Sequence, residues 1–297
     1  MKYIISAIGF LHATIHLNNV RFPLRFFLIT FIWSWVLWTP LVLGSLKMVP
    51  VSDNLISILI FPAIVLGAFG PLAGALFALR HEKGNGSIRK YLQSFLDFKL
   101  GWKVYVIPIL IFGGSTFIAW FFPELLGEER LSMLLPSIWI YIPCLLFMIF
   151  LGGGQEELGW RGYALPILES KFGIWFANII LGIIWAFWHM PLWFITGTSQ
   201  TYMNFGGFIL LMVGYSFILS WTKKISGNKP FSGLYVHGLA NSFIAIMPTL
   251  TLQKNMPQTR FWIWVTLTLF IGIIITILRK NSPLTNRSKV NNIEHKS

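Results

Sequence analysis

The chain has 297 residues, of which 55% are hydrophobic and only 11% are charged, and its mean hydropathy is +0.68. Soluble domains carry about 25% charged residues, so this composition excludes an ordinary soluble protein and indicates a polytopic membrane protein. The net charge of +13 does not indicate nucleic-acid binding. The basic residues sit in short clusters between apolar runs, which membrane topology and anionic lipid explain better. Cys144 is the single cysteine, so the sequence excludes a disulfide framework and a cysteine metal cluster.

Residues 1–25 are predicted to form a cytoplasmic or interfacial segment that is retained in the mature protein, and its first part is either an interfacial or a partly inserted helix. A short apolar run follows Lys2, as in a signal peptide, but no small-residue cleavage site comes after it, and His12 and His16 interrupt it. The two histidines stand four residues apart, as a metal-binding pair would. Two ligands without a third do not make a metal site, so we assign them to the interfacial segment.

Eight apolar runs follow, and each is long enough to cross a bilayer, which takes about 20 apolar residues in a helix. They predict an all-α transmembrane bundle over residues 26–279, followed by a polar cytoplasmic tail at 280–297. The predicted spans are 26–45, 54–79, 104–123, 131–152, 174–194, 205–222, 231–252 and 261–278.

The lysines and arginines are distributed unequally between the two sides of the membrane in this eight-span arrangement. One side receives 19 of the 23, mostly within 80–103, 223–229 and 279–296. The other side receives only Lys47, Arg130, Lys254 and Arg260. By the positive-inside rule, this pattern places both termini in the cytoplasm.

Two local features of the cytoplasmic half are also predicted. Basic and apolar positions interleave over Ile88–Leu100, which indicates a helix lying on the membrane surface. Gly70 and Gly74 of the second span form a small-xxx-small pair, which is expected to let a neighbouring helix approach closely.

The stretch Gln155–Gly162, which reads Gln-Glu-Glu-Leu-Gly-Trp-Arg-Gly, places two carboxylates and an arginine inside this apolar chain. Ionisable groups are costly at membrane depth, so they are functional-site candidates. In a helix, Glu157 and Arg161 stand four residues apart and can form a charge-assisted pair. Glu156 lies about 100° round the helix from Glu157 and is left to face another partner. One paired carboxylate beside one unpaired carboxylate is typical of a general base with a supporting neighbour.

Two later segments place further polar groups at membrane depth. His189 follows Trp185 by four residues late in the fifth span, so the two share a helical face. His237 and Asn241 bear the same relation early in the seventh span.

A turn at Lys171–Gly173 would stand midway between Glu156 and His189, so an antiparallel hairpin would bring these two residues to the same depth. This pairing conflicts with the predicted span edges unless the fourth helix is long or is broken near Gly152–Gly154. Broken backbone is tolerated at membrane depth where it lines a wet cavity. We favour the pairing and expect such a break.

Each of these signals has a structural alternative. A histidine in a membrane more often joins helices by hydrogen bonds than it acts as a catalyst. The Glu157–Arg161 pair is as readily structural as catalytic, and the tryptophans are expected mostly to pack or to anchor the helices at the interface. Together, one glutamate, two histidines and one asparagine on three intramembrane helices indicate amide hydrolysis. That reaction requires a general base, an imidazole partner and donors for the oxyanion.

At these residues the sequence resembles the CPBP intramembrane proteases, also called the Abi or CAAX-protease and bacteriocin-processing family, which includes the type II CAAX prenyl proteases. The resemblance rests on Glu156-Glu157-x-x-x-Arg161, Trp185-x-x-x-His189 and His237-x-x-x-Asn241, in that order, and covers roughly 139–248. It implies a catalytic core at about 131–252. In that core Glu156 would activate a water with the assistance of His189, and His237 and Asn241 would stabilise the oxyanion. Glu157 and Arg161 would hold the first motif in place.

The resemblance favours a metal-free reaction with no cofactor, although one carboxylate and two imidazoles could bind zinc. The chain has no His-Glu-x-x-His motif. The implied partner is a membrane-associated peptide or protein. The compact, cysteine-poor chain with short loops indicates a prokaryotic plasma membrane. Relatives trim prenylated proteins, process peptide pheromones or bacteriocins, or confer bacteriocin immunity, and the sequence does not select among these roles.

Two other classes of function stay open at this point. One is a non-catalytic membrane partner or immunity protein of the same fold, although such a scaffold has no need of costly intramembrane ionisable groups. The other is a secondary transporter with a glutamate–histidine proton relay, which inverted sequence repeats would indicate and which the sequence does not show.

Overall fold

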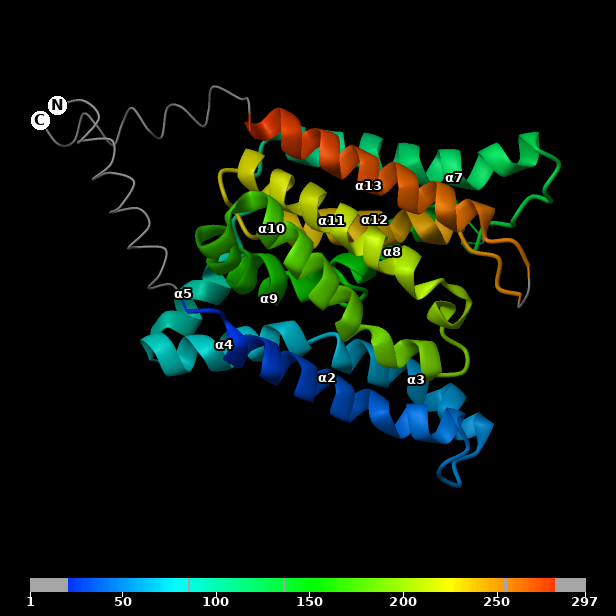
Figure 1. Ribbon diagram of the computed structural model, residues 1–297, viewed down its shortest axis with the longest axis horizontal. Helices are drawn as coiled ribbons and strands as arrows, with labels where there is room; N and C mark the ends of the chain where they lie inside the picture. Colours follow the sequence, from blue (N-terminus) through cyan, green and yellow to red (C-terminus); the bar gives the residue numbers. More distant parts are fainter. Residues whose placement is uncertain (1–20, 85, 136, 254–255, 281–297) are drawn as a thin grey trace, which may run out of the picture.

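The computed structural model describes residues 21–84, 86–135, 137–253 and 256–280 (Figure 1). Within these ranges the regular secondary structure is entirely helical, which confirms the all-α prediction. Most of the predicted amino-terminal segment, including His12 and His16, and nearly all of the predicted tail at 280–297 lie outside the described residues.

The eight predicted spans all contain helix. Among the described residues, six stretches are long and apolar enough to cross a membrane, and one of them, Ile138–Phe194, contains most of the fourth predicted span and all of the fifth. A shorter apolar helix, Phe231–Ile246, takes the place of the seventh. The main helices are α2 (Leu24–Ser45), α3 (Asp53–Gly67), α4 (Gly70–Lys83), α5 (Gly86–Ser94), α6 (Trp102–Pro108), α7 (Gly114–Leu125), α8 (Tyr141–Phe150), α9 (Glu157–Gly159), α10 (Leu165–Trp188), α11 (Phe205–Ile225), α12 (Phe231–Ile246) and α13 (Thr259–Lys280).

Three predicted element edges were wrong. The fourth span begins only at Ile138, where the Ser137 hydroxyl accepts a hydrogen bond from the Trp139 amide and starts the helix. The seventh ends at Ile246, because the residue before a proline, here Pro248, is disfavoured in helical conformation. In place of the predicted surface helix Ile88–Leu100, the structure has the shorter α5. The chain leaves helical conformation after Ser94 and leads to the start of α6.

The fourth span is broken at its glycines, as the sequence predicted. Helix α8 ends at Phe150, and Gly153 has a φ of +124°, which residues with a side chain rarely adopt. The chain continues as a 3₁₀ turn at Gly154–Glu156, the single turn α9 and a π-helical segment at Trp160–Ala164. The break lets the first motif lie inside the bundle instead of at the end of a straight helix.

The predicted hairpin between the fourth and fifth spans is also present. Gly173 has φ +73° and ψ 170°, so α10 consists of two helices that meet at a sharp turn. The second helix returns toward the first motif. It ends next to His189, whose Nε2 lies 4.0 Å from Oε1 of Glu156.

Gly70 and Gly74 let α4 pack closely on α2, as expected. A Cβ atom on Gly70 would collide with the Ser34 hydroxyl and come within 2.7 Å of the Thr30 carbonyl oxygen. A Cβ on Gly74 would come within 2.6 Å of the Phe26 carbonyl oxygen. Any larger residue at these positions would therefore push the two helices apart.

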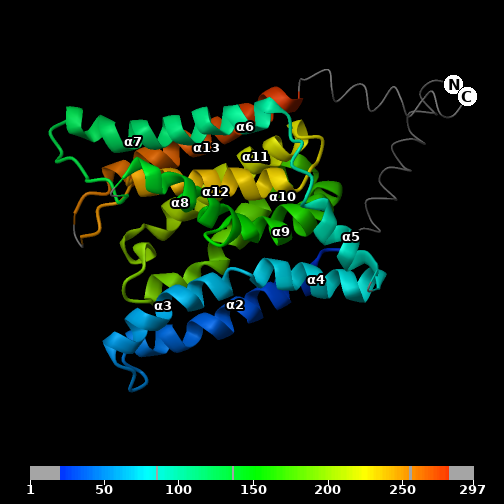
Figure 2. The same cartoon turned by 180° about the vertical axis from the view of Figure 1, so that it is seen from behind.

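The helices form three layers, visible from both sides in Figures 1 and 2. Helices α2, α3 and α4 form one outer layer, α8 to α12 form the middle layer that carries the motifs, and α6, α7 and α13 form the other outer layer. The start of α2, helix α5, the α11–α12 turn and the end of α13 gather at one end of the bundle. Within the described residues, the basic clusters predicted to be cytoplasmic lie at that end, with the exception of Arg161, which is buried.

Candidate active site

Glu157 lies at the centre of a buried cluster of charged and polar groups. Its Oε1 atom accepts hydrogen bonds from Nη1 of Arg161 at 2.9 Å and from Nδ1 of His237 at 2.9 Å. The side chains of Glu157 and Arg161 are 0% exposed. The predicted contact between Glu157 and Arg161 is therefore present, and the structure adds His237 of α12 as a third member of the cluster. The Arg161 guanidinium also stacks on Trp185, with its carbon 4.5 Å from the ring centroid.

Glu156 has different partners from its neighbour. Its Oε2 atom accepts a hydrogen bond from the indole N–H of Trp185 at 2.7 Å and a longer one from that of Trp160 at 3.4 Å. Both donors are uncharged, and the Glu156 side chain is 6% exposed. The carboxylate is thus oriented without the help of Arg161, and its Oε1 atom is directed toward His189.

His189 is oriented by the backbone of its own helix. Its Nδ1 atom lies 2.9 Å from the carbonyl oxygen of Trp185. A carbonyl only accepts, so this partner assigns the hydrogen of a neutral imidazole to Nδ1 and leaves the lone pair on Nε2. The separation of 4.0 Å between Nε2 and Oε1 of Glu156 is too long for a direct hydrogen bond and fits one bridging water.

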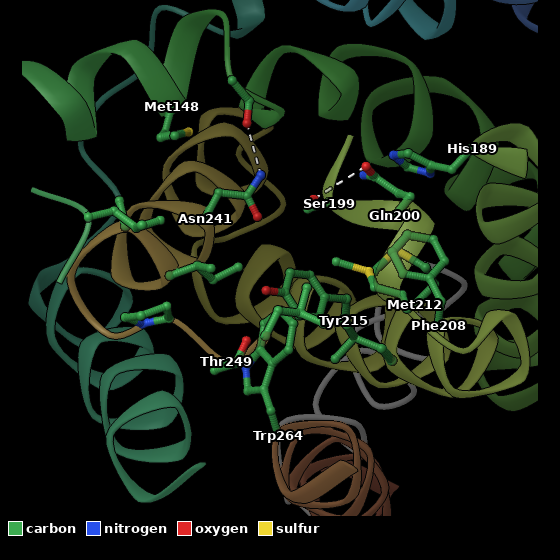
Figure 3. Close-up of a pocket in the computed structure, with 18 of the residues that line it drawn as sticks. Met148, His189, Ser199, Gln200, Phe208, Met212, Tyr215, Asn241, Thr249 and Trp264 are labelled. Carbon is green, nitrogen blue, oxygen red and sulfur yellow. Dashed lines mark hydrogen bonds between the residues drawn. The ribbon is translucent and has the colours of Figure 1, made fainter. Parts of the chain in front are cut away.

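His237 and Asn241 lie on one face of α12 and border the broken loop. The amide nitrogen of Asn241 donates to the carbonyl oxygen of Gly152 at 2.9 Å (Figure 3). A Cβ atom on Gly153 would lie 2.8 Å from Nε2 of His237 and 2.5 Å from the Asn241 amide nitrogen. Both polar groups therefore adjoin the same glycine, and a side chain at 153 would displace them.

One cavity of about 530 Å³ joins these residues. Glu156, His189, His237 and Asn241 all line it, whereas Glu157 and Arg161 lie behind its wall. The rest of the lining is mainly apolar and comes from α8, α11, α12, α13 and the connections near 131–134, 199–203 and 248–252. The structure thus brings together all six residues singled out in the sequence, and their catalytic roles remain predictions.

The tryptophans of the site do more than the expected packing or anchoring. Trp160 and Trp185 are 0% and 1% exposed, and both donate to Glu156. The sequence does carry a signal for Trp160, which follows Glu156 by four residues and so shares its helical face. It carries none for the Trp185 contact, which joins residues 29 apart.

Two further residues hold the backbone of the first motif, and sequence reasoning missed both. The Lys223 ammonium of α11 donates to the Arg161 carbonyl oxygen at 2.6 Å. The Tyr91 hydroxyl of α5 donates to the Leu158 carbonyl oxygen. Each satisfies a carbonyl in a segment where 3₁₀ and π geometry interrupts the regular helical hydrogen bonds.

The zinc alternative finds no ready ligand set in the described part of the chain. No group of three or more His, Cys, Asp or Glu side chains is arranged there to hold a metal ion. Nδ1 of His237 already contacts Glu157, and Nδ1 of His189 contacts a carbonyl oxygen. The metal-free reaction itself stays a prediction.

Comparison with known proteins shows which sequences the segment around the site resembles. Residues 137–243 match the family described as Type II CAAX prenyl endopeptidase Rce1-like. Over 232 residues the chain is 25% identical to CAAX prenyl protease 2 of Methanococcus maripaludis, with 74% of this chain and 82% of that protein covered. Both matches confirm the resemblance predicted from the three motifs. With these motifs inside the matched segment of a multi-pass helical bundle, the chain resembles the Rce1-like prenyl endopeptidases and is identified as a multi-pass membrane protease.

Proposed function

We propose that this protease hydrolyses a peptide bond in a membrane-associated peptide or protein, with Glu156 as the general base that activates the attacking water. The observation that carries this proposal is the pair of atoms Oε1 of Glu156 and Nε2 of His189, 4.0 Å apart on the wall of the cavity. A water between them would contact both groups, and a general base must reach the proton that it removes within hydrogen-bond distance.

The orientation of His189 supports the direction of this step. Because Nδ1 faces a carbonyl, Nε2 accepts a hydrogen bond from the water, while Oε1 of Glu156 accepts the other. The lone pairs of the water oxygen are then left for the substrate carbonyl carbon. Glu156 takes one proton as the new C–O bond forms, and it can return that proton to the leaving amine when the C–N bond breaks.

His237 and Asn241 are suited to stabilise the oxyanion of the tetrahedral intermediate. The Asn241 amide has two hydrogens, and only one is used by the Gly152 carbonyl. The Nε2 atom of His237 lies on the same side of the glycine loop. Donors that are already oriented before the reaction stabilise a developing charge most effectively, because they need no rearrangement in the transition state.

The first candidate substrate is a prenylated peptide ending in a CAAX sequence. The name of the methanococcal relative points to this class, in which a cysteine followed by two aliphatic residues carries a prenyl group. The mainly apolar lining of the cavity suits aliphatic side chains. Cleavage of such a peptide after the modified cysteine would leave the lipid in the bilayer beside the enzyme.

The test uses purified protein in lipid nanodiscs and an internally quenched S-farnesyl peptide of this type. The Glu156→Gln variant should fold with the wild-type thermal stability and should not cleave the peptide. The matched control is Glu169→Gln, because the Glu169 carboxylate, on the hairpin, accepts from the Ser220 hydroxyl of α11 and does not line the cavity. Full activity of a folded Glu156→Gln variant would overturn the general-base assignment.

Two further outcomes would test the substrate class separately from the proteolytic reaction. If the wild-type protein leaves the farnesyl peptide intact, the substrate class is wrong. Membrane peptides that accumulate uncut in cells expressing only Glu156→Gln would then identify the natural one. If no peptide accumulates in such cells, the proteolytic proposal itself fails.

A further inference from the structure

Three residues that line the cavity each carry a buried polar atom with no hydrogen-bond partner among the described residues. The atoms are Oη of Tyr215, Oγ1 of Thr249 and Nε1 of Trp264. The three side chains are 1%, 0% and 3% exposed. A buried polar group without a partner destabilises a folded protein, and few occur in native structures. Three of them on one cavity indicate that their partner is a ligand.

The three groups come from different parts of the fold. Tyr215 belongs to α11 and Trp264 to α13, with ring centroids 6.0 Å apart, and Thr249 lies in the connection that follows α12. Figure 3 draws them in the same part of the cavity, away from His189 and Asn241. The Tyr215 ring lies 6.2 Å from the His237 ring. That distance corresponds to about two residues of an extended chain, at about 3.3 Å per residue.

The hydrogen-bonding capacity of the three groups limits which chemical groups of a ligand can bind to them. An indole N–H only donates, whereas the two hydroxyls both donate and accept. Peptide main chain offers carbonyl acceptors and N–H donors together. A chain held extended for cleavage has lost its helical hydrogen bonds, so its amide groups need partners from the protein when they enter an apolar site.

The charge of the site favours an uncharged group over a carboxylate. No lysine or arginine is found among the described residues that line the cavity. Arg260, one turn before Trp264 on α13, is committed to Glu128 at 2.8 Å and to the Trp120 carbonyl at 3.1 Å. A buried carboxylate without a cation would be strongly disfavoured, whereas a neutral amide meets no such penalty.

We propose that Tyr215, Thr249 and Trp264 form a binding subsite for the main-chain amides of an extended substrate, about two residues from the scissile bond. The inference rests on the proposed function, because it takes the cavity as the place where the substrate lies. In the free protein these three atoms have almost no surface accessible to water, so small rotations of the side chains are needed before they can bind the substrate main chain.

The experiment measures binding without cleavage. The Glu156→Gln protein in nanodiscs is titrated with N-acetyl-leucyl-leucine N-methylamide, and binding is followed by the rise in Tm. Tyr215→Phe, Thr249→Val and Trp264→Phe, each made in the Glu156→Gln background, remove the polar atoms while largely preserving shape. Each should weaken binding on the order of 2- to 10-fold, the range for one hydrogen bond. The control is Thr268→Val, because the Thr268 hydroxyl is also buried and unpartnered on α13 but does not line the cavity.

Two comparisons make the result decisive. The free acid N-acetyl-leucyl-leucine should bind more weakly than the N-methylamide, and equal or tighter binding of the acid would overturn the assignment to neutral amides. Unchanged affinity in all three variants, or no Tm response to either probe, would overturn the subsite.

The stability of the variants without ligand is a second readout. Removal of an unpartnered polar atom should leave Tm unchanged or higher, so a lower Tm in all three variants would show a structural role and contradict the proposal. Because none of these measurements needs catalysis, failure of the subsite and failure of the proteolytic proposal remain distinguishable.

Discussion

Nδ1 of His237 lies 2.9 Å from Oε1 of Glu157, although the two residues are 80 positions apart in the chain. A carboxylate accepts hydrogen bonds, so Nδ1 must donate, and Nε2 is the atom left beside the glycine loop. To donate to an oxyanion, Nε2 must also carry a hydrogen. His237 would then act as an imidazolium, with its charge balanced by Glu157.

We therefore expect Glu157→Gln to lower kcat, by up to about 10²-fold, with a smaller effect on KM. The side-chain amide introduced by this substitution can still accept a hydrogen bond from Nδ1 of His237, but it carries no charge to stabilise the imidazolium. The measurement is steady-state kinetics on the farnesyl peptide, beside the Glu169→Gln control. An unchanged kcat would show that the charge of Glu157 plays no part in turnover.

The Glu157–Arg161 pair should be energetically coupled. Removal of either partner leaves the other charge buried, which costs about 3–5 kcal/mol in the free energy of unfolding. Chemical denaturation of Glu157→Ala, Arg161→Ala and the double variant in detergent forms a double-mutant cycle. The double variant should lose less than the sum of the single variants. Strict additivity would argue against the contact, although Arg161 also loses its stacking on Trp185.

Asn241→Ala should lower kcat by about 10²–10³, with a smaller change in KM, if the amide donates to the oxyanion. The same substitution removes the hydrogen bond to the Gly152 carbonyl, so the thermal stability of the variant must be measured beside its kinetics. A loss of activity that tracks only a loss of folded protein would reduce Asn241 to a structural role.

The grouping of basic clusters at one end of the bundle predicts that this end faces the cytoplasm. Reporter fusions after Lys229 and after Ser297 should report the cytoplasm, and a fusion after Thr198 should report the outside. Residues 226–230 and 195–204 lie at opposite ends of the bundle, so these two fusions must give opposite signals. The same signal from both would contradict the eight-span arrangement.

The purified protein should carry no stoichiometric metal, and cleavage should survive exhaustive chelation. The reason is the role expected for Asn241, because an amide is a poor zinc ligand but a good oxyanion donor. Elemental analysis provides the direct measurement. One zinc per chain, with activity lost on chelation and restored by zinc, would reassign Glu156, His189 and His237 as metal ligands.

The sequence by itself determined the features that depend on neighbours along the chain. The eight apolar runs, the break at the three glycines and the turn at Gly173 follow from hydropathy and from conformations that glycine tolerates. The Glu157–Arg161 contact follows from helical spacing alone. These relations are local, so they did not require knowledge of how the helices pack.

Only the tertiary structure decided which distant groups meet. It selected Trp185 as the donor to Glu156, His237 as the partner of Glu157 and Lys223 as the donor to the Arg161 carbonyl. It also placed Tyr215, Thr249 and Trp264 on one cavity, although none belongs to a motif. The physical reason is that helix rotation and depth are fixed by close packing between layers. An apolar sequence leaves those two variables open, because many rotations bury or expose similar apolar surface in lipid.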